Sequence, residues 1–381
     1  MSKLCTAGIL GASGFIGSRL VEWLILNNLA EVRPIVRSWK GMARLSRFNL
    51  ETWIADAVNE SALEKALSGC DVLFNCIAGD RDVILKSTTA AYRAAAKAGV
   101  RRIVYLSSAV VHGFNPPVGT QDDSPIILNQ PFKYNVSKAM AERLLRRLRV
   151  DGAVEVVTLR PSIVFGPRSV GWTTNIALDL LTKNAYLIDG GSGICNTVYI
   201  DNLIEAMWLA AMSDRSPNRD FLIGDGERIT WADLYDAVAK AVGVEFSAVP
   251  SIASEDVSRI FAEQRQAQRR AALGRFVWAV RESLPFKAKA SLIRLLPPNL
   301  KNTLKQVSVP FSKNKGSAML GNEKRSFPEL DLEIASLQQC HYVLPITKAK
   351  ELIGYVPRVS FSEGCRRTTE WLRFAFGYKQ Q

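Results

Sequence analysis

The chain has 381 residues, of which 48% are hydrophobic, and this size allows one large α/β unit with a smaller lobe or two ordinary domains. Its hydrophobic content excludes global disorder, and without a long uncharged apolar run or a signal-like N-terminus we expect neither a membrane-spanning helix nor a cleaved leader. The formal net charge is +13, and six scattered cysteines and two histidines argue against a disulfide framework and a His-rich metal site, so we expect reduced thiols in a cytoplasmic protein.

Strand and helix patterns alternate through the first half of the chain. Strand-like apolar runs cover residues 6–12, 31–38, 71–79, 101–111 and 154–165, and helical spacing marks 15–28, 61–67, 83–98 and 135–149. The nearly continuous apolar run at 71–79 is typical of a strand buried in a parallel sheet. Repeated strand–helix units with short connections predict an α/β fold built on a doubly wound parallel sheet.

The second half of the chain is less regular. We expect a strand near 221–226, a helix over 230–243 that begins at Thr230, and two helices separated by a turn within 346–372. Between them, residues 251–330 mix Arg-rich pieces with proline-punctuated apolar ones, and hold 15 Lys and Arg against 6 Asp and Glu.

The first predicted strand ends in a glycine-rich stretch, GILGASGFIGSRL. Its glycines at Gly11, Gly14 and Gly17 allow a tight turn and close backbone approach, while the helix that follows directs free N–H groups outward. Because the stretch opens the first strand–helix unit, we expect it to hold the pyrophosphate of a dinucleotide.

Two later segments carry residues suited to proton transfer. Tyr134 and Lys138 form a YxxxK pattern on one helix face, and Ser107 and Ser108 lie at the end of a strand. Together with the GxxGxxG loop, these motifs resemble the extended short-chain dehydrogenase/reductase family, also called the NAD-dependent epimerase/dehydratase family. The resemblance covers roughly residues 4 to 245 and 342 to 375.

The resemblance implies an enzyme that moves a hydride between a nicotinamide and a secondary alcohol or ketone carbon. Tyr134 is expected to act as acid/base, Lys138 to tune it and hold the nicotinamide ribose, and Ser108 to orient the reacting oxygen. A free tyrosine has a pKa near ~10, so a nearby ammonium would favour the phenolate.

The second predicted strand ends at Arg37 and Ser38 without an acidic residue. A guanidinium there suits a ribose 2′-phosphate, so we expect NADP(H), with NAD(H) as the alternative. By resemblance, Asp56 lies near the adenine, and Ala78, Pro161 and Ser162 stand on strand ends that line the cofactor. The full expected cofactor set is Gly11, Ser13, Gly14, Phe15, Ile16, Gly17, Arg37, Ser38, Ala55, Asp56, Ala78, Ser107, Tyr134, Lys138, Pro161 and Ser162.

The resemblance also predicts the division of the chain. Residues 1–168 would form an NAD(P)-binding Rossmann domain, with its sheet completed by about 197–225. Residues 169–196 and 226–381 would form a smaller C-terminal substrate-binding lobe, which carries the basic insertion at about 251–330.

Departures from the family pattern narrow the expected reaction. Ala109 and Val110 follow Ser108 where sugar-nucleotide dehydratases place an acidic pair. Asn196 and Thr197 stand where epimerases and dehydratases commonly have an arginine for the sugar diphosphate, although Arg168 or Lys183 could replace it. The chain looks nearer the 3β-hydroxysteroid-dehydrogenase-like and dihydroflavonol-reductase-like branches, which act on bulky hydrophobic substrates. A nucleotide-sugar epimerase is the first alternative, and a non-catalytic cofactor-binding scaffold is the second.

The basic insertion bears on the partners. Its apolar residues, such as Phe276, Trp278 and Leu295, alternate with Arg275, Arg281 and other basic residues. A lid over the substrate cleft, contact with an anionic membrane at its inner face, and an oligomer contact remain open. We expect a small-molecule substrate and no nucleic acid, since no nucleic-acid-reading motif is present, and a homodimer stays open.

Overall fold

A computed structural model describes residues 4–266 and 330–377. Contacts divide the chain into two compact units, one of residues 1–251 with 333–381 and one of residues 252–332. In the second unit, the described part contains a helix over 254–266. The predicted amphipathic surface around Phe276 and Leu295 lies outside the described residues, and the predicted domain boundaries stay a prediction.

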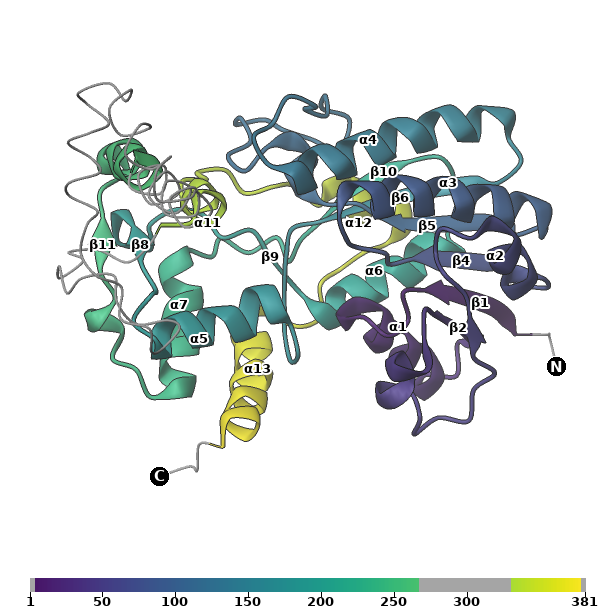
Figure 1. The fold of residues 1–381 in the computed structure, drawn as a ribbon, viewed down its shortest axis with the longest axis horizontal. Coiled ribbons are helices and arrows are strands. Elements are labelled where there is room, and N and C mark those ends of the chain that lie inside the picture. The colour runs from purple at the N-terminus through teal and green to yellow at the C-terminus, as the bar shows by residue number, and fades with distance from the viewer. Residues whose placement is uncertain (1–3, 267–329, 378–381) are drawn as a thin grey trace, which may run out of the picture. The chain divides into compact units, whose positions relative to one another are not determined.

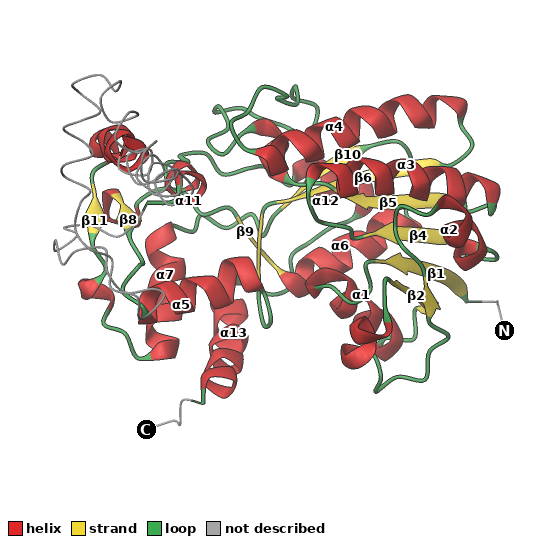
Figure 2. Ribbon diagram, viewed as in Figure 1, coloured by secondary structure: helices red, strands yellow, loops and turns green. Residues whose placement is uncertain are grey.

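The first unit is built on a seven-stranded sheet in which every pairing is parallel (Figure 2). The strand order is β10-β6-β5-β4-β1-β2-β3. Its strands are β1 (Cys5–Leu10), β2 (Ala30–Val36), β3 (Trp53–Ile54), β4 (Val72–Asn75), β5 (Arg102–Leu106), β6 (Glu155–Pro161) and β10 (Asp220–Ile223). The order runs in opposite directions on the two sides of β1, which confirms the predicted doubly wound α/β fold and opens a crevice at the carboxyl ends of β1 and β4.

Helices cover both faces of this sheet (Figure 1). One face carries α2 (Glu60–Leu67), α3 (Arg81–Lys97) and α4 (Lys133–Leu148), and the other carries α1 (Phe15–Leu26), α6 (Ile200–Met212) and α12 (Thr347–Ile353). Neighbouring strand residues point to opposite faces, so Leu73 joins the buried cluster under α2 and α3 while Phe74 joins the one under α1 and α6. Both layers bury apolar side chains, which explains the uninterrupted apolar strands of the sequence.

The remaining elements lie outside the central sheet. They are the short helices η1 (Trp39–Arg44), η2 (Ala109–His112), η3 (Arg149–Asp151), η4 (Val170–Thr174), η5 (Asp189–Gly191) and η6 (Phe246–Ala248), the strands β7 (Ile163–Phe165), β8 (Leu187–Ile188), β9 (Thr197–Tyr199) and β11 (Ser251–Ile252), and the helices α5 (Asn175–Leu181), α7 (Trp231–Val242), α11 (Leu332–Leu337) and α13 (Phe361–Phe376). Helix α7 begins with a capping box between Thr230 and Asp233, which confirms the predicted start.

Two predicted strands were too long. The run at 101–111 leaves the sheet after Leu106, because the Ser108 hydroxyl accepts the Val110 N–H and Gly113 turns the chain at φ +92°. The run at 154–165 divides at Ser162, and β7 pairs with β9 instead of continuing in the main sheet. Both interruptions place serine hydroxyls at the carboxyl edge of the sheet.

Candidate active site

The glycine-rich loop connects β1 to α1 and leaves the first turn of the helix open. Gly11 has φ +83°, and a Cβ on Gly17 would stand 2.3 Å from the Gly11 carbonyl oxygen, so the loop and helix pack too closely for a side chain. Gly14 caps α1 without a side-chain hydrogen bond. The first N–H groups of α1 can therefore receive an anionic group.

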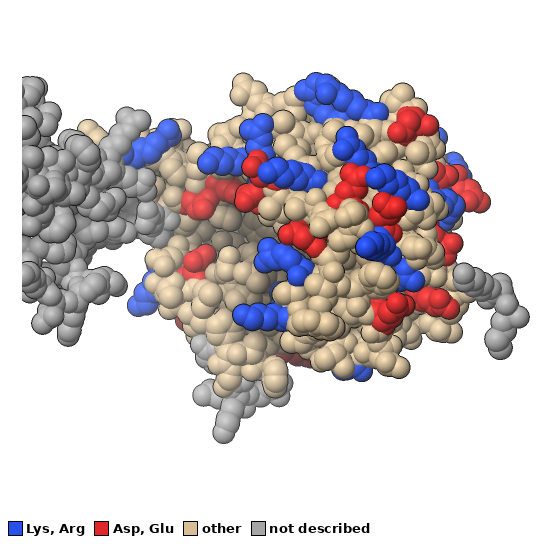
Figure 3. Space-filling model, turned by 45° about the vertical axis from the view of Figure 1, so that its right-hand side comes forward, with Lys and Arg blue, Asp and Glu red and all other residues tan. Residues whose placement is uncertain are grey.

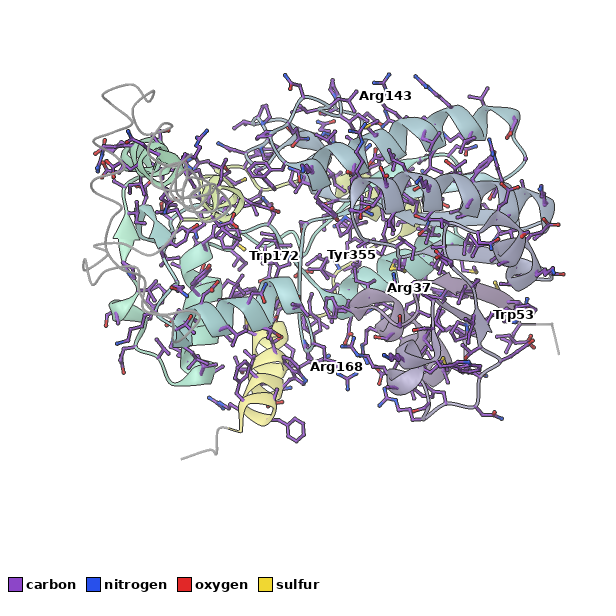
Figure 4. The ribbon with its side chains drawn as sticks, viewed as in Figure 1. Arg37, Trp53, Arg143, Arg168, Trp172 and Tyr355 are labelled. Atoms are coloured by element: carbon purple, nitrogen blue, oxygen red, sulfur yellow. The ribbon has the colours of Figure 1, made fainter. Side chains whose placement is uncertain are left out.

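The ends of β2 and β3 lie beside this loop. Arg37 and Ser38 are exposed directly after β2, and Figure 4 labels Arg37 near α1. A Cβ on Gly41 in η1 would stand 2.9 Å from Ser13 Cβ, so η1 packs against the glycine loop. After β3, Ala55 N donates to the Val36 carbonyl (3.0 Å), and the Asp56 carboxylate accepts the Val58 N–H (3.1 Å).

A cavity of about 580 Å³ opens at the carboxyl ends of β4, β5 and β6. It brings together nine of the residues predicted for the site, namely Phe15, Ile16, Ala78, Ser107, Ser108, Tyr134, Lys138, Pro161 and Ser162. The other eight do not line it and follow β1, β2 and β3 or begin α1: Gly11, Ser13, Gly14, Gly17, Arg37, Ser38, Ala55 and Asp56.

Lys138 is buried in α4 below the cavity surface. Its Nζ donates to the carbonyls of Leu106 (2.7 Å) and Ile77 (3.2 Å) and stands 6.0 Å from the centre of the Tyr134 ring. Burial lowers the pKa of Lys138 to about 8. The ammonium is thus fixed at the edge where β5 ends, through hydrogen bonds to backbone atoms.

Tyr134 is 37% exposed and lines the cavity. Partial burial raises the pKa of its phenol, and the Glu333 carboxylate raises that pKa further. The sequence predicted that Lys138 would favour the phenolate. Burial and the Glu333 carboxylate act on the phenol in the opposite direction, and the phenol is protonated at neutral pH.

Three serines, just after the ends of β5 and β6, line the same cavity as Tyr134. The hydroxyls of Ser107 and Ser162 are buried without a hydrogen-bond partner among the described residues, and both side chains line the cavity. Among residues 4–266 and 330–377, the hydrogen-bond partner of the Ser108 hydroxyl is the Val110 N–H, at a long 3.5 Å. Buried hydroxyls in this state are suited to a bound polar group.

Arg160 directly precedes Pro161 and Ser162 in the sequence, but its side chain does not line the cavity. It is fully buried and donates to both oxygens of Glu142 (3.0 and 2.7 Å) and to Asp220 (3.2 Å). Pro161 and Ser162 therefore line the cavity, whereas the Arg160–Glu142 ion pair connects β6 to α4.

Sequence reasoning did not identify the wall formed by the later part of the chain. Trp172, Ile194, Glu333, Leu337, Cys340 and Leu344 line the cavity; Figure 4 labels Trp172. The four-residue spacing of Glu333 and Leu337, which places both on one helix face, was the only local signal.

Asn196, at the position expected to hold arginine in sugar-nucleotide enzymes, lines the cavity and secures this wall. Its Nδ2 donates to the Tyr342 carbonyl (3.0 Å), and its Oδ1 accepts the Leu344 N–H (2.8 Å). The two candidate replacements, Arg168 and Lys183, are exposed and do not line the cavity. Both hydrogen-bonding ends of the amide are engaged by the protein backbone.

Within residues 4–266 and 330–377, no group of three or more His, Cys, Asp or Glu could hold a metal ion. No helix in the same ranges is long and apolar enough to cross a membrane. All six cysteines are free thiols.

The doubly wound sheet, the glycine-rich loop after β1, and Ser108, Tyr134 and Lys138 around one cavity are typical of a nucleotide-dependent oxidoreductase of the extended short-chain type. The chain belongs to the NAD dependent epimerase/dehydratase family, whose model matches residues 7–224.

Relatives within this family include reductases and epimerases. The chain is 26% identical over 249 residues to the 4-hydroxy-2-methyl-3-oxo-4-farnesyl-3,4-dihydroquinoline-1-oxide ketoreductase of Stigmatella aurantiaca, covering 62% of this chain and 73% of the relative. It is 27% identical over 250 residues to a UDP-glucose 4-epimerase of Vibrio cholerae, covering 61% and 74%.

The fold is also that of a sugar-nucleotide dehydratase. A dTDP-glucose 4,6-dehydratase double mutant from Streptomyces venezuelae, solved with NAD bound, matches 98% of each chain with a TM-score of 0.66 and 18% identity. This likeness establishes the shared fold and no shared substrate.

Proposed function

We propose that the protein is an NADP(H)-preferring reductase that acts on the ketone or secondary alcohol of a bulky, hydrophobic substrate. The observation that carries this proposal is the chemistry of the cavity wall beside Tyr134. Among the described residues, only Lys138 and Glu333 are charged, and most of the other lining side chains are apolar. A sugar diphosphate would find no arginine there, whereas an apolar substrate of moderate size would bury its surface.

The residues at the sheet edge fit a dinucleotide. The open N-terminus of α1 would hold the pyrophosphate, and the unpartnered hydroxyls of Ser107 and Ser162 would accept polar groups of the nicotinamide end. Arg37, exposed after β2 where no acid follows, supports a preference for a ribose 2′-phosphate. The bound nicotinamide would supply or accept the hydride.

The chain's own residues would handle the proton and the reacting oxygen. Ser108 would hydrogen-bond the carbonyl oxygen, and the protonated Tyr134 phenol would donate to it. Lys138, held by two backbone carbonyls, would stabilise the phenolate that forms. The Tyr134 phenol is protonated at neutral pH, which suits ketone reduction, the direction in which it acts first as an acid.

The test is oxidation of NADPH by a panel of hydrophobic ketones, comparing the wild-type chain with Tyr134→Phe. We expect Tyr134→Phe to lower kcat by about 10²–10⁴-fold while leaving the NADPH dissociation constant unchanged, because only the proton donor is lost. Tyr92→Phe, on α3 away from the cavity, is the matched control and should retain full activity.

Three outcomes would count against the proposal. Retained turnover in Tyr134→Phe would reject the assigned acid. Interconversion of an alcohol without net NADPH consumption would indicate the epimerase instead. Cofactor binding without turnover across the panel would indicate a scaffold.

A further inference from the structure

His112 is a buried histidine at the end of η2, the short helix that begins directly after Ser108. Its side chain is 2% exposed and does not line the cavity. Its Nδ1 lies 3.2 Å from the Pro125 carbonyl oxygen, and its Nε2 lies 3.2 Å from Nη1 of Arg160. Each ring nitrogen therefore connects the Ser108 segment to a different part of the chain.

The two partners determine the protonation state of the ring. A carbonyl oxygen only accepts a hydrogen bond, and a guanidinium only donates one. Nδ1 must therefore carry the proton donated to Pro125, and Nε2 must be the unprotonated acceptor for Arg160. Burial and the Arg160 charge lower the pKa of His112, which agrees with a neutral imidazole. A second proton, on Nε2, would place two donors opposite each other.

Within the described chain, the charged groups that act on this imidazole come from β6 and α4. Besides burial, Arg160 and Arg146 oppose its protonation, and Glu142 favours it. Arg160 is fully buried and donates to both oxygens of Glu142 (3.0 and 2.7 Å) and to the Asp122 carbonyl. It also contacts Asp220 at 3.2 Å. Loss of the imidazole acceptor would leave a buried N–H of this guanidinium without that partner.

This contact joins the Ser108 segment to the helix of the proposed proton donor. The connection runs from His112 through Arg160 to Glu142. Glu142 lies in α4 four positions after Lys138, so the two side chains share one face of the helix. Ser108 precedes His112 by four residues, and the intervening turn is η2 itself.

A second connection joins η2 to the start of the same helix. Gln130 Nε2 donates to the Val110 carbonyl (3.1 Å), and Asn135 Nδ2 donates to Gln130 Oε1 (2.9 Å). Asn135 is buried and directly follows Tyr134 in α4. The η2 segment is thus held to α4 near both of its ends, and the His112 connection is the one that a proton can break.

We propose that His112 is a positioning residue for Ser108, whose neutral imidazole accepts from Arg160 and thereby holds η2 against α4. Protonation of the imidazole would release η2 and displace the Ser108 hydroxyl, so the reaction would fail at low pH. The inference rests on the proposed function for the role of Ser108. A displacement of about 1 Å in a catalytic geometry can cost about 10²-fold in rate, so a small shift of η2 would be sufficient.

The first test is amide hydrogen exchange in the full chain, which needs no substrate. The Val111 N–H donates to the Ser108 carbonyl (3.2 Å), and the Ile127 N–H donates to the Val111 carbonyl (2.7 Å). Protection of peptides that contain these amides reports how firmly η2 is held. Peptides from β4 serve as the internal reference, and protection is measured at pH 8 and at pH 4.5.

Four proteins are compared, namely the wild type, His112→Gln, His112→Phe and His341→Gln. Glutamine retains an acceptor for Arg160 and does not titrate, whereas phenylalanine retains a ring without an acceptor. His341 is exposed, so its variant removes the other histidine of the chain as a matched control.

We expect protection of η2 in the wild type to fall about tenfold or more from pH 8 to pH 4.5, relative to β4, and His341→Gln to behave identically. His112→Gln should keep its protection at both pH values, and His112→Phe should be weakly protected at both. Unchanged protection in the wild type, or an equal fall in His112→Gln, would overturn the inference. If His112→Phe does not fold, the comparison of wild type with His112→Gln still decides.

A catalytic arm separates this inference from the proposed function. With NADPH and a hydrophobic ketone at pH 8, His112→Phe should lower kcat about tenfold, change the NADPH dissociation constant less than about twofold, and be rescued by His112→Gln. Full turnover in His112→Phe would overturn the positioning role. If the wild type reduces no ketone while η2 protection responds to His112, the proposed reaction fails and the anchoring of η2 by His112 stands.

Discussion

At the scale of single residues, the site contains a buried lysine whose charge is energetically unfavourable in the folded protein. Lys138 is 2% exposed, and its pKa falls to about 8 because burial penalises the ammonium. The chain retains this charge beside Tyr134, where an apolar residue would pack without the penalty. Such a cost is expected where a charge serves function more than stability.

The Lys138 penalty predicts a pH-dependent stability. Between about pH 8 and the ordinary lysine pKa, the unfolded chain binds a proton that the folded chain does not, so this group makes stability rise with pH. Relative to Lys138→Met, the wild type should gain about 3 kcal/mol of unfolding free energy between pH 7 and pH 10. Urea unfolding of both cofactor-free proteins at the two pH values measures the difference. A constant difference would show that the Lys138 pKa is not lowered by folding.

Arg37 gives a second prediction at this scale. Removing its guanidinium should weaken the site for a 2′-phosphate and leave the rest of the dinucleotide site intact, because the side chain is exposed beyond β2. We expect Arg37→Ala to raise KM for NADPH by about tenfold or more and to change KM for NADH less than about twofold. Steady-state rates with both cofactors supply the measurement and its internal control. A wild type that prefers NADH would reject NADP(H).

At the scale of elements, the glycine-rich turn from β1 to α1 sets how closely the helix approaches the carboxyl edge of the sheet. Gly11, Gly14 and Gly17 occupy positions in this turn with different structural requirements. Gly11 needs its positive φ, Gly17 needs the absence of a Cβ, and Gly14 has an ordinary φ of −73° and leaves the helix N-terminus open. The GxxGxxG spacing thus reflects both the positive φ of Gly11 and the close packing of Gly17 against the Gly11 carbonyl.

This difference predicts unequal effects of alanine at two glycines of one loop. A Cβ at Gly17 would stand 2.3 Å from the Gly11 oxygen, whereas at Gly14 the nearest atom, again the Gly11 oxygen, is 3.3 Å away. Gly17→Ala should therefore lose about 3 kcal/mol or more, and Gly14→Ala less than about 1 kcal/mol. Chemical unfolding without cofactor separates this packing effect from effects on binding. Equal losses would contradict it.

At the scale of the whole molecule, the cavity is completed by chain that returns from the C-terminal side. Asn196 holds residues 342 and 344 through its side-chain amide, while Gln338 and Trp231 hold the end of α11. The charged surface is mixed on the face that Figure 3 shows, with Lys and Arg beside Asp and Glu. The whole basic excess of residues 251–330 lies outside the described residues, because the described residues 251–266 hold two Arg against three Asp and Glu.

The Asn196 contacts predict that substrate and cofactor binding can be separated. Asn196→Ala should loosen the wall at 342–344 and raise KM for a hydrophobic ketone by about tenfold, with the NADPH dissociation constant changed less than about twofold. Kinetics with the ketone and direct titration with NADPH provide the two readouts. Asn184→Ala removes an exposed amide that donates to the neighbouring Thr182 hydroxyl and does not line the cavity, and it should leave both values unchanged. A parallel rise in both constants would indicate general unfolding.

The sequence by itself determined the alternating elements, the doubly wound sheet and the family, because these depend on local periodicity and on residues close together in the chain. The family resemblance of the motifs predicted that Ser108, Tyr134 and Lys138 share one site, and all three line one cavity. Only the tertiary structure decided that strand runs end at Leu106 and Pro161, that Arg160 turns inward, and that Glu333 and Leu337 complete the cavity. Those outcomes depend on packing between segments that are far apart in sequence, and no local pattern encodes which distant segment will supply a wall.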